Sequence, residues 1–549
     1  MPNIILTSLL FTILSNGLNT NLPLAEKTCT QFNSPIKKYL KPGIANHFKG
    51  GWEGVDLVYK TEQPDNIFDS SILNMFFEKH PTFLPFKKDV VDFYSNRKFE
   101  TFWISNNHLK KIGLDLIQKI EHIENEGLTN KLSYTEELKS LVIIQRSKIE
   151  YNLEILLSCQ YLQYANYVWL SKQNEYYRIS KWFIPIKKIK NKDLLNQLTN
   201  VVDVFSNPPI FGNYNKLQQY LVFYNQLKQN GGFVKINAIG KNVYKLGDSS
   251  IQIAYIRKLL FQVQDLSNDN HSTIFDQDLF NGVLSFQKRM GLIPTGKISN
   301  LEIAELNKPI ETRISQIKVN MERMRWLPLI DKVEHIEINI PEYKLHLYNQ
   351  KGLLWSMKIV IGKTHQPTAV FSGEIQEIIL CPYWNIPPGI LNKEILPALR
   401  RNKNYLINND MEWNNGKIRQ KPGNNNALGL IKFLFPNRFN IYMHDTPNKY
   451  LFNQNTRSFS HGCIRLEDAL KMAVYLLKNY PEWDSLKLTQ TMKTGKEKRI
   501  GLNPKIPIFI VYKTAWVDEN GKLNFRNDIY HKDNDLNKSL SKKTPIVAK

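Results

Sequence analysis

The sequence predicts a multidomain α+β protein with a helical N-terminal region, a small helical module and a mainly-β C-terminal domain that carries an insertion. The length of 549 residues is enough for about three or four domains. Apolar residues follow helical spacing through most of the first half of the chain. From residue 333 the spacing changes to alternation of apolar and polar residues, which is typical of strands.

The N-terminus has the pattern of an export signal. The first 25 residues carry no charged side chain, and residues 4–14 form an apolar run of signal-peptide length. The run is short for a membrane span. We expect an exported protein whose signal is cleaved near Ala25, with an uncleaved anchor as the alternative.

The region from residue 92 to residue 229 is predicted to be mostly helical. Residues 109–128 place apolar side chains near helical spacing. Residues 153–170 are apolar around much of the circumference, which predicts a central buried helix. Residues 214–232 form another amphipathic helix that ends at a Gly-Gly stop signal.

A small helical module is predicted over residues 247–308. Residues 250–264 and 275–292 both have helical patterns, and a short helix follows at residues 300–307. Asp276 is placed to cap the second of these helices.

The C-terminal domain has the texture of a β domain. Residues 333–349 and 353–362 flank a Gln-Lys-Gly turn, which predicts a β-hairpin. Further strands are predicted at residues 374–380, 440–444 and 506–517.

Two segments depart from this texture. Residues 387–426 are polar, with helix potential at their start, and are interpreted as an insertion in the β domain. The tail from Lys532 is rich in charged residues and serine, so we expect it to be disordered.

The chain is strongly basic. The formal net charge is +23, which favours anionic partners. The positive charge is spread along the whole chain, so a bias of composition accounts for it, with attraction to a polyanion such as a cell wall as the alternative. No nucleic-acid-reading motif is visible, so nucleic acid is not an expected partner.

One of the four cysteines stands in an unusual setting. Cys29, Cys159, Cys381 and Cys463 are scattered and form no Cys-x-x-Cys pair, which excludes a zinc ribbon or a thioredoxin motif. Cys463 follows His-Gly in the stretch "SFSHGCIR". Apolar residues from position 466 to position 477 then follow one helical face, so we expect a helix to start just after the thiol.

That setting predicts an activated nucleophile. The N-terminus of a helix and the charge of Arg465 would both favour the thiolate of Cys463. Gly462 allows close approach of the backbone, and the N–H groups of Gly462 and Cys463 could form an oxyanion hole. A thiol nucleophile needs a base, and His444 and His461 are the local candidates.

We favour His444 as the base, because side chains at positions i and i+2 seldom form an in-line hydrogen bond. Spacing alone leaves two other readings open. The His-x-Cys pair could be structural, or His444, His461 and Cys463 could bind zinc.

The longer motif resembles a known family. The stretch "HDTPNKYLFNQNTRSFSHGCIR" resembles the signature of the YkuD-type L,D-transpeptidases, a histidine followed after a spacer by Ser/Thr-His-Gly-Cys. Residues 93–104 and 320–328 resemble the larger YcbB-like periplasmic subfamily, and residues 247–308 are similar to the small helical peptidoglycan-binding domain. The fold class implied is a helical scaffold, a peptidoglycan-binding module, and an L,D-transpeptidase domain with a capping insertion.

The resemblance implies a function and a site. The expected activity is a periplasmic peptidoglycan L,D-transpeptidase that forms 3–3 cross-links between a donor tetrapeptide and an acceptor stem through a thioester on Cys463. No cofactor and no metal are expected, and a carbapenem is expected to form an adduct at Cys463. An L,D-carboxypeptidase, a lipoprotein-attaching transpeptidase and a non-catalytic wall-binding scaffold are the alternatives. The implied site residues are Cys463 and His444 for catalysis; Gly462, His461 and Ser460 for the oxyanion and loop support; and Tyr442 and Arg465 for substrate binding.

The implied domain boundaries follow from these segments. They are 1–25 for the signal or anchor, 26–240 for the scaffold, 241–310 for the binding module, 311–332 for a linker helix, 333–531 for the catalytic domain with the insertion at about 387–426, and 532–549 for the tail.

Overall fold

The computed structural model describes residues 66–145, 150–171, 180–200, 203–239, 243–329 and 333–541. The predicted export signal and Cys29 lie outside these ranges. Among the helices so described, none combines the length and apolar character that a bilayer span requires. Within them the predicted fold class is confirmed: a helical N-terminal region is followed by a mainly-β domain.

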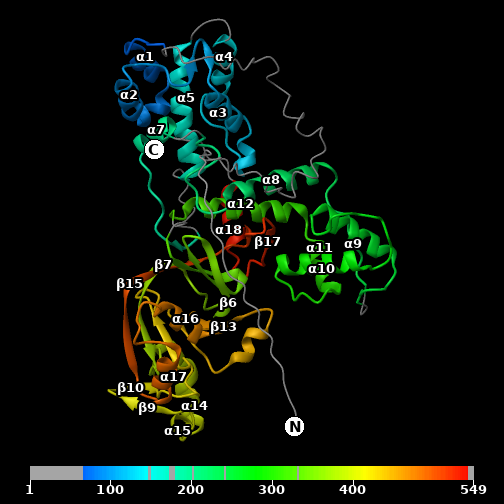
Figure 1. Cartoon of the computed structure of the whole chain (residues 1–549), viewed down its shortest axis with the longest axis vertical. Helices are drawn as coiled ribbons and strands as arrows, with labels where there is room; N and C mark the ends of the chain where they lie inside the picture. The colour runs from blue at the N-terminus through cyan, green and yellow to red at the C-terminus, as the bar shows by residue number, and fades with distance from the viewer. Residues whose placement is uncertain are drawn as a thin grey trace, which may run out of the picture. The chain divides into compact units, whose positions relative to one another are not determined.

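The N-terminal region is built around one buried helix, α5 (Figure 1). Every side chain of α5 from Leu153 to its end is buried, and a π-helical turn, η5, continues it. The prediction of a central helix is therefore confirmed. The described elements of this region are α1 (Ser71–Lys79), η3 (Pro81–Phe86), α2 (Lys87–Asn96), β1 (Ile104–Ser105), β2 (His108–Leu109), α3 (Lys111–Glu121), η4 (Ile123–Glu126), α4 (Thr135–Gln145), α5 (Tyr151–Tyr164), η5 (Ala165–Trp169), α7 (Asn191–Asn200) and α8 (Tyr214–Gln229).

A buried carboxylate fastens α5 to its surroundings. Glu154 accepts hydrogen bonds from the backbone N–H groups of Phe102, Trp103 and Ile104 and from the hydroxyl of Tyr94. Burial raises the pKa of Glu154 to about 7, against the lowering effect of these hydrogen bonds. The group is explained as a structural anchor, since both of its carboxylate oxygens accept hydrogen bonds from neighbouring segments.

The small module contains three helices, α9 (Ile251–Gln262), α10 (Gln277–Met290) and α11 (Asn300–Leu306), which lie together in Figure 1. The predicted cap is present, because the side chain of Asp276 accepts from the N–H of Leu279 at 2.9 Å. Ser299 and Glu302 form a capping box at the start of α11.

Helix α12 (Ile310–Trp326) differs from the expected linker. Most of its side chains are buried, including Arg313, Arg323 and Arg325, so the helix is part of the packed interior. Its arginines are paired there: Arg325 with Glu322, Arg313 with Glu305, and Arg323 with Asp533. These arginines of the predicted linker helix are thus members of buried ion pairs.

The β domain is a sheet that closes on itself. Strand β11 pairs with β12 on one side and with β7 on the other, so the order β11-β12-β14-β6-β5-β4-β15-β7 returns to β11. Strand β3 (Trp182–Phe183) adds a parallel pairing to β7. The barrel strands are β4 (His335–Asn339), β5 (Lys344–Asn349), β6 (Gly352–Gly362), β7 (Val370–Leu380), β11 (Ile431–Leu434), β12 (Met443–His444), β14 (Ile464–Leu466) and β15 (Lys498–Val511), and β13 (Ser458–Ser460) pairs with β6.

The first strand of the predicted hairpin is divided in two in the structure. Residues 333–349 form two strands, β4 and β5, because a 3-10 turn, η6 (Ile340–Glu342), and a left-handed Tyr343 reverse the chain between them. Proline at the start of that turn has no N–H to give to a ladder. The last predicted strand is likewise divided, into β15 and β16 (Ala515–Val517).

The insertion forms a small lobe, which we define as residues 384–420. Strands β8 (Trp384–Asn385), β9 (Met411–Asn414) and β10 (Lys417–Gln420) make its sheet in the order β8-β10-β9. Its own hydrophobic cluster consists of Ile386, Ile395, Met411 and Ile418. The lobe helices are α13 (Pro388–Ile390), η7 (Leu391–Ile395), α14 (Leu396–Arg401) and α15 (Tyr405–Asn408).

The expectation of a disordered tail from Lys532 is wrong for its first residues, which form helix α18 (Lys532–Leu540). Leu536 is fully buried, and Asp533 pairs with Arg323 at 2.6 Å. The composition is that of a solvated tail, but one apolar and one acidic side chain dock on α12. The remaining elements of the domain are η8 (Lys449–Asn453), α16 (Ala469–Leu476), α17 (Ser485–Lys493) and β17 (Leu523–Phe525).

Candidate active site

Two short parallel strands bring the predicted pair together. Met443 of β12 faces Ile464 of β14, and His444 faces Arg465. Cys463 directly precedes β14, and the N–H of Ile464 donates to the carbonyl of Tyr442 at 3.1 Å. The predicted nucleophile and base therefore lie at neighbouring strand ends, although 19 positions separate them in the sequence.

The expected helix behind the thiol is not where the sequence placed it. Cys463 is followed by β14, and α16 begins only at Ala469, after Asp468 caps it by accepting from the N–H of Lys471. Helix-like spacing continued backwards into the strand, because alternate buried positions of a short strand also fit a helical face. The thiol therefore receives no helix dipole.

The thiol of Cys463 is a neutral group in this setting. Burial raises its pKa, and hydrogen bonds from Tyr442 together with the charges of Lys432 and Arg465 offset this only in part. The recorded contact of Sγ is to the carbonyl oxygen of Asn440, at 3.8 Å. The predicted resting thiolate is thus replaced by a thiol that needs a base during attack.

His444 is held as a neutral imidazole. Its Nδ1 lies 2.5 Å from the backbone oxygen of Asp445, which assigns the hydrogen to Nδ1 and the basic lone pair to Nε2. Burial lowers the pKa of His444 to about 3, and the charges of Arg465 and Lys432 add to the lowering. The contacts of the two side chains are with backbone oxygens: Nδ1 of His444 with Asp445 and Sγ of Cys463 with Asn440.

The carboxylate of Asp445 does not orient the imidazole. Its oxygens accept from the N–H of Leu430 and from Lys449 Nζ, so the carboxylate fastens the loops on either side. The orienting group is the backbone carbonyl, which any residue type could supply.

Tyr442 and Lys432 flank the thiol. The ammonium of Lys432 on β11 lies 3.9 Å from the ring centroid of Tyr442. The Tyr442 ring lies 5.7 Å from that of His444. Burial and the neighbouring Cys463 raise the pKa of Tyr442, so its hydroxyl is a neutral donor beside the sulfur. Tyr442, expected to bind substrate, thus also contacts the nucleophile.

The turn before the thiol is tied by side chains. Ser460 Oγ donates to the carbonyl of Cys463 at 2.5 Å and accepts from the N–H of Gly462 at 3.2 Å. Gly462 has a φ of 111°, a conformation that favours glycine. Since the N–H of Gly462 is engaged, and no described residue is recorded as accepting from the N–H of Cys463, the latter is the donor left for an oxyanion.

His461 is bonded to the lobe. Its Nε2 bonds to Oε1 of Glu394 in the lobe at 2.8 Å. The side chain of His461 is 28% exposed, whereas His444 as a residue is only 4% exposed. The preference for His444 as the base agrees with this geometry, and His461 connects the turn to the lobe instead of orienting His444.

Arg465 lies beside His444 with unused hydrogen-bonding capacity. Within the described residues no carboxylate pairs with its guanidinium, and its Nε is buried without a hydrogen-bond partner. Burial lowers the pKa of Arg465. The group is free to take an acceptor from a ligand.

Several residues of the site were missed by sequence reasoning. Thr368 Oγ1 donates to the carbonyl of Gly462 at 2.8 Å, and Tyr530 contacts Thr368 in turn. Lys432 had a weak signal, because it interrupts the apolar run of β11. Thr368 and Tyr530 had none, since Thr368 lies 94 positions before Gly462 and Tyr530 lies 68 positions after it.

The zinc reading gains no support from the geometry. Among the residues that the structure describes, no group of three or more His, Cys, Asp or Glu side chains is arranged to hold a metal ion. His461 bonds to Glu394, and His444 to a backbone carbonyl. A neutral thiol, a neutral imidazole and a free backbone N–H are the kinds of group that acyl transfer through a thioester requires.

Comparison with protein families agrees with this site. Residues 333–492 match the YkuD model, described as the L,D-transpeptidase catalytic domain, and residues 88–228 match the model described as the Scaffold domain. The resemblance to YkuD-type L,D-transpeptidases is therefore confirmed, and the matched part contains the strands that carry His444 and Cys463.

One curated protein is also similar in sequence to this chain. A Haemophilus influenzae protein named "Putative L,D-transpeptidase" is 29% identical over 301 residues, which cover 51% of this chain and 56% of that protein. The chain thus spans about half the length of this relative.

The solved structures found to be similar include several L,D-transpeptidases. An L,D-transpeptidase from Mycobacterium smegmatis is 14% identical with a TM-score of 0.18 and covers 32% of this chain and 58% of its own. One from Stackebrandtia nassauensis is 10% identical with a TM-score of 0.20 and covers 49% and 94%. The structure of the LD transpeptidase LdtMt1 in complex with imipenem is 13% identical with a TM-score of 0.17 and covers 33% and 59%. These scores are too low to carry an argument.

Proposed function

We propose, from the premise that residues 333–492 match an L,D-transpeptidase catalytic domain, that this protein forms 3–3 cross-links in peptidoglycan through a thioester on Cys463. The observation that carries the proposal is the parallel pairing of β12 with β14, which places the Cys463 thiol and the His444 imidazole at adjoining strand ends. The substrates are a donor tetrapeptide stem and an acceptor stem.

The first half-reaction forms the thioester. His444 Nε2 takes the thiol proton as Sγ adds to the carbonyl at the L-centre of the third stem residue, which we take to be diaminopimelate. The bond to the terminal D-Ala nitrogen then breaks, and the same proton passes from His444 to the departing amine. The neutral imidazole can accept the proton because burial keeps it uncharged at neutral pH.

The second half-reaction forms the cross-link. The side-chain amine of the acceptor stem adds to the thioester carbonyl and loses a proton to His444. Sγ is expelled and recovers that proton, so the enzyme is unchanged and one amide has replaced another. In both halves the N–H of Cys463 supports the oxyanion, while Ser460 and Gly462 hold the turn.

Arg465 suits a carboxylate of the stem peptide. Its guanidinium has no carboxylate partner among the described residues and lies beside the base. Tyr442 is placed to contact both the sulfur and a bound stem, since it lies beside Cys463 and its ring faces His444.

The lobe supplies a cover for the thioester. It reaches the turn through the contact between Glu394 and His461. A thioester enzyme must keep water from its intermediate, and a lobe over the donor stem serves that purpose. The site of action follows from the substrate: the protein works in the periplasm, where the predicted export signal would deliver it.

Product analysis of purified protein with tetrapeptide muropeptides tests the proposal. Cross-linked dimers joined through two third-position residues are expected, with release of D-Ala. Cys463→Ala is expected to abolish both products, and Cys381→Ala, which removes a buried thiol bonded to the carbonyl of Met492, is the matched control. Tripeptide monomers alone would assign the protein as an L,D-carboxypeptidase, and activity of Cys463→Ala would remove the thioester mechanism altogether.

A further inference from the structure

The Gly462–Cys463 peptide is anchored from behind by the residue Thr368. Thr368 is fully buried, and its Oγ1 donates to the carbonyl of Gly462 at 2.8 Å. The same oxygen accepts from the N–H of Gly362 at 3.0 Å, so its direction is fixed on both sides. A hydroxyl with both a donor and an acceptor partner has little freedom to rotate.

Tyr530 closes this arrangement. Its hydroxyl donates to the carbonyl of Gly362 at 2.6 Å and accepts from the N–H of Thr368 at 3.3 Å. Burial raises the pKa of Tyr530 to about 12, so the hydroxyl keeps its hydrogen at neutral pH. Tyr530 thus fixes the backbone of the two residues that hold the turn.

The backbone at Gly362 is packed closely against the backbone at Gln366 and at Gly462. A Cβ added to Gly362 would lie 2.2 Å from the carbonyl oxygen of Gln366 and 3.0 Å from the Cα of Gly462. Only glycine leaves room for Thr368 to reach the carbonyl behind the thiol.

Because of peptide geometry, the bond from Thr368 to the Gly462 carbonyl also sets the direction of the Cys463 N–H. The carbonyl of Gly462 and the N–H of Cys463 belong to one planar trans unit and point in opposite directions. Fixing the carbonyl therefore fixes the direction of the N–H. Donation to the carbonyl also polarises the peptide, which strengthens the N–H as a donor.

We propose that Thr368 and Tyr530 are positioning residues that aim the N–H of Cys463 at the carbonyl oxygen of the acyl group under attack. The inference rests on the proposed acyl-transfer function and names the residues that make its oxyanion donor. Both residues act through the Gly462–Cys463 peptide, Thr368 by bonding to its carbonyl and Tyr530 by bonding to Thr368 and Gly362.

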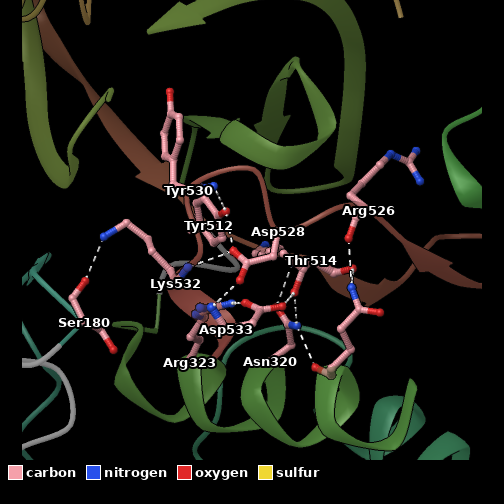
Figure 2. A network of polar contacts seen from close by, with 12 residues as sticks. Ser180, Asn320, Arg323, Tyr512, Thr514, Arg526, Asp528, Tyr530, Lys532 and Asp533 are labelled. Atoms are coloured by element: carbon pink, nitrogen blue, oxygen red, sulfur yellow. Dashed lines mark hydrogen bonds and ion pairs between the residues drawn. The ribbon is translucent and has the colours of Figure 1, made fainter. Parts of the chain in front are cut away.

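The C-terminal segment carries Tyr530 into place, as Figure 2 shows. The N–H of Tyr530 donates to the hydroxyl of Tyr512 at 2.8 Å, and that hydroxyl donates to Asp528 at 2.6 Å. Asp528 also accepts from the N–H groups of Lys532 and Asp533 at the start of α18. The helix that the sequence suggested was a loose tail is therefore part of the support of the active site.

The same network reaches the interior helix α12. Asp533 pairs with Arg323 at 2.6 Å and accepts from Thr514 Oγ1 at 2.6 Å. Asn320 then bonds to Thr514 through both its amide nitrogen and its amide oxygen. A continuous chain of hydrogen bonds thus connects α12 to the turn at Cys463.

Two reactions of the Cys463 sulfur distinguish a misdirected N–H of Cys463 from a general loss of structure at the site. Acylation by imipenem opens the β-lactam C–N bond as Sγ adds to the carbonyl, and the thiol proton ends on the ring nitrogen, so an oxyanion develops. Alkylation by iodoacetamide displaces iodide at a saturated carbon and develops none. Both rates are measured on the full chain by intact mass.

The variants are chosen to isolate the hydroxyl groups. Thr368→Val keeps the shape and removes the donor, Thr368→Ser restores it, and Tyr530→Phe removes only the phenol oxygen. Tyr480→Phe is the matched control, because the Tyr480 hydroxyl contacts the exposed Asn503 instead.

We expect Thr368→Val to slow acylation about 10- to 100-fold, less than the loss of a whole oxyanion donor, and Tyr530→Phe about 3- to 10-fold. Alkylation should stay within about twofold for both variants, and Thr368→Ser should recover most of the acylation rate.

The inference is overturned if acylation by both variants matches the wild type, or if acylation and alkylation fall together. Tyr530→Phe decides the question if Thr368→Val does not fold. A wild type that is acylated yet forms no cross-link counts against the proposed reaction alone, and a wild type that is not acylated by imipenem counts against both.

Discussion

The barrel and the lobe meet at the active site but are built on very different cores. The barrel encloses one continuous cluster that runs through all its strands and includes Ile338, Ile464 and Met443. The lobe rests on four buried side chains. Because stability follows buried apolar area, the lobe is expected to open locally while the barrel stays folded. The pair that does the chemistry lies on the rigid part, and the group that touches the lobe, His461, lies at the boundary.

The largest expected effect separates the two histidines. His444→Ala should lower the acyl-transfer rate about 100- to 10,000-fold, because it removes the general base. His461→Ala should lower it less than about tenfold, because an exposed side-chain contact contributes little. Steady-state rates of D-Ala release measure both. Equal losses for the two variants would show that the lobe contact, and not only the barrel pair, is needed for proton transfer.

The next effect compares the two cores directly. Ile338→Ala in the barrel should lower the free energy of unfolding by about 2–5 kcal/mol, as burial of a core isoleucine requires. Ile418→Ala removes a side chain equally buried in the lobe, but should leave the main thermal transition almost unchanged and speed amide hydrogen exchange within residues 384–420. If Ile418→Ala lowers the main transition as much as Ile338→Ala, the lobe and the barrel unfold as one unit.

The smallest effect concerns the pH dependence of the half-buried thiol of Cys463. Since burial raises the pKa of Cys463, the thiolate fraction is low at neutral pH and grows as the pH rises through and above the ordinary range of a thiol. The rate of alkylation by iodoacetamide should therefore rise about tenfold per pH unit from pH 7, with no plateau below about pH 9. A plateau near neutral pH would mean that a preformed thiolate exists, as a helix N-terminus would have produced.

Much of the site was readable in the sequence because its chemistry is local. Cys463, Gly462, Ser460 and His461 fall within four positions, and His444 belongs to the same long motif. The central helix α5 and the cap at Asp276 were also predictable, since spacing and capping are properties of short segments. The confirmed catalytic-domain match covers the same stretch.

What the sequence misjudged depended on partners far along the chain. The expected helix start behind Cys463 is a strand, because β14 is stabilised by pairing with β6 and β12, and no local pattern records those neighbours. The tail at Lys532 became helix α18 because Asp533 pairs with Arg323 and Leu536 packs into the hydrophobic core.

The sequence by itself determined the reactive groups and the order of the domains. Residue types and short spacings carry that information, and no long-range contact is needed to read it. Tertiary structure alone decided the state and the aim of those groups. Burial made the thiol and the imidazole of Cys463 and His444 neutral, and a threonine and a tyrosine distant in sequence fixed the peptide beside the sulfur. Solvation and hydrogen-bond direction are properties of the packed surroundings, so they exist only once the chain has folded.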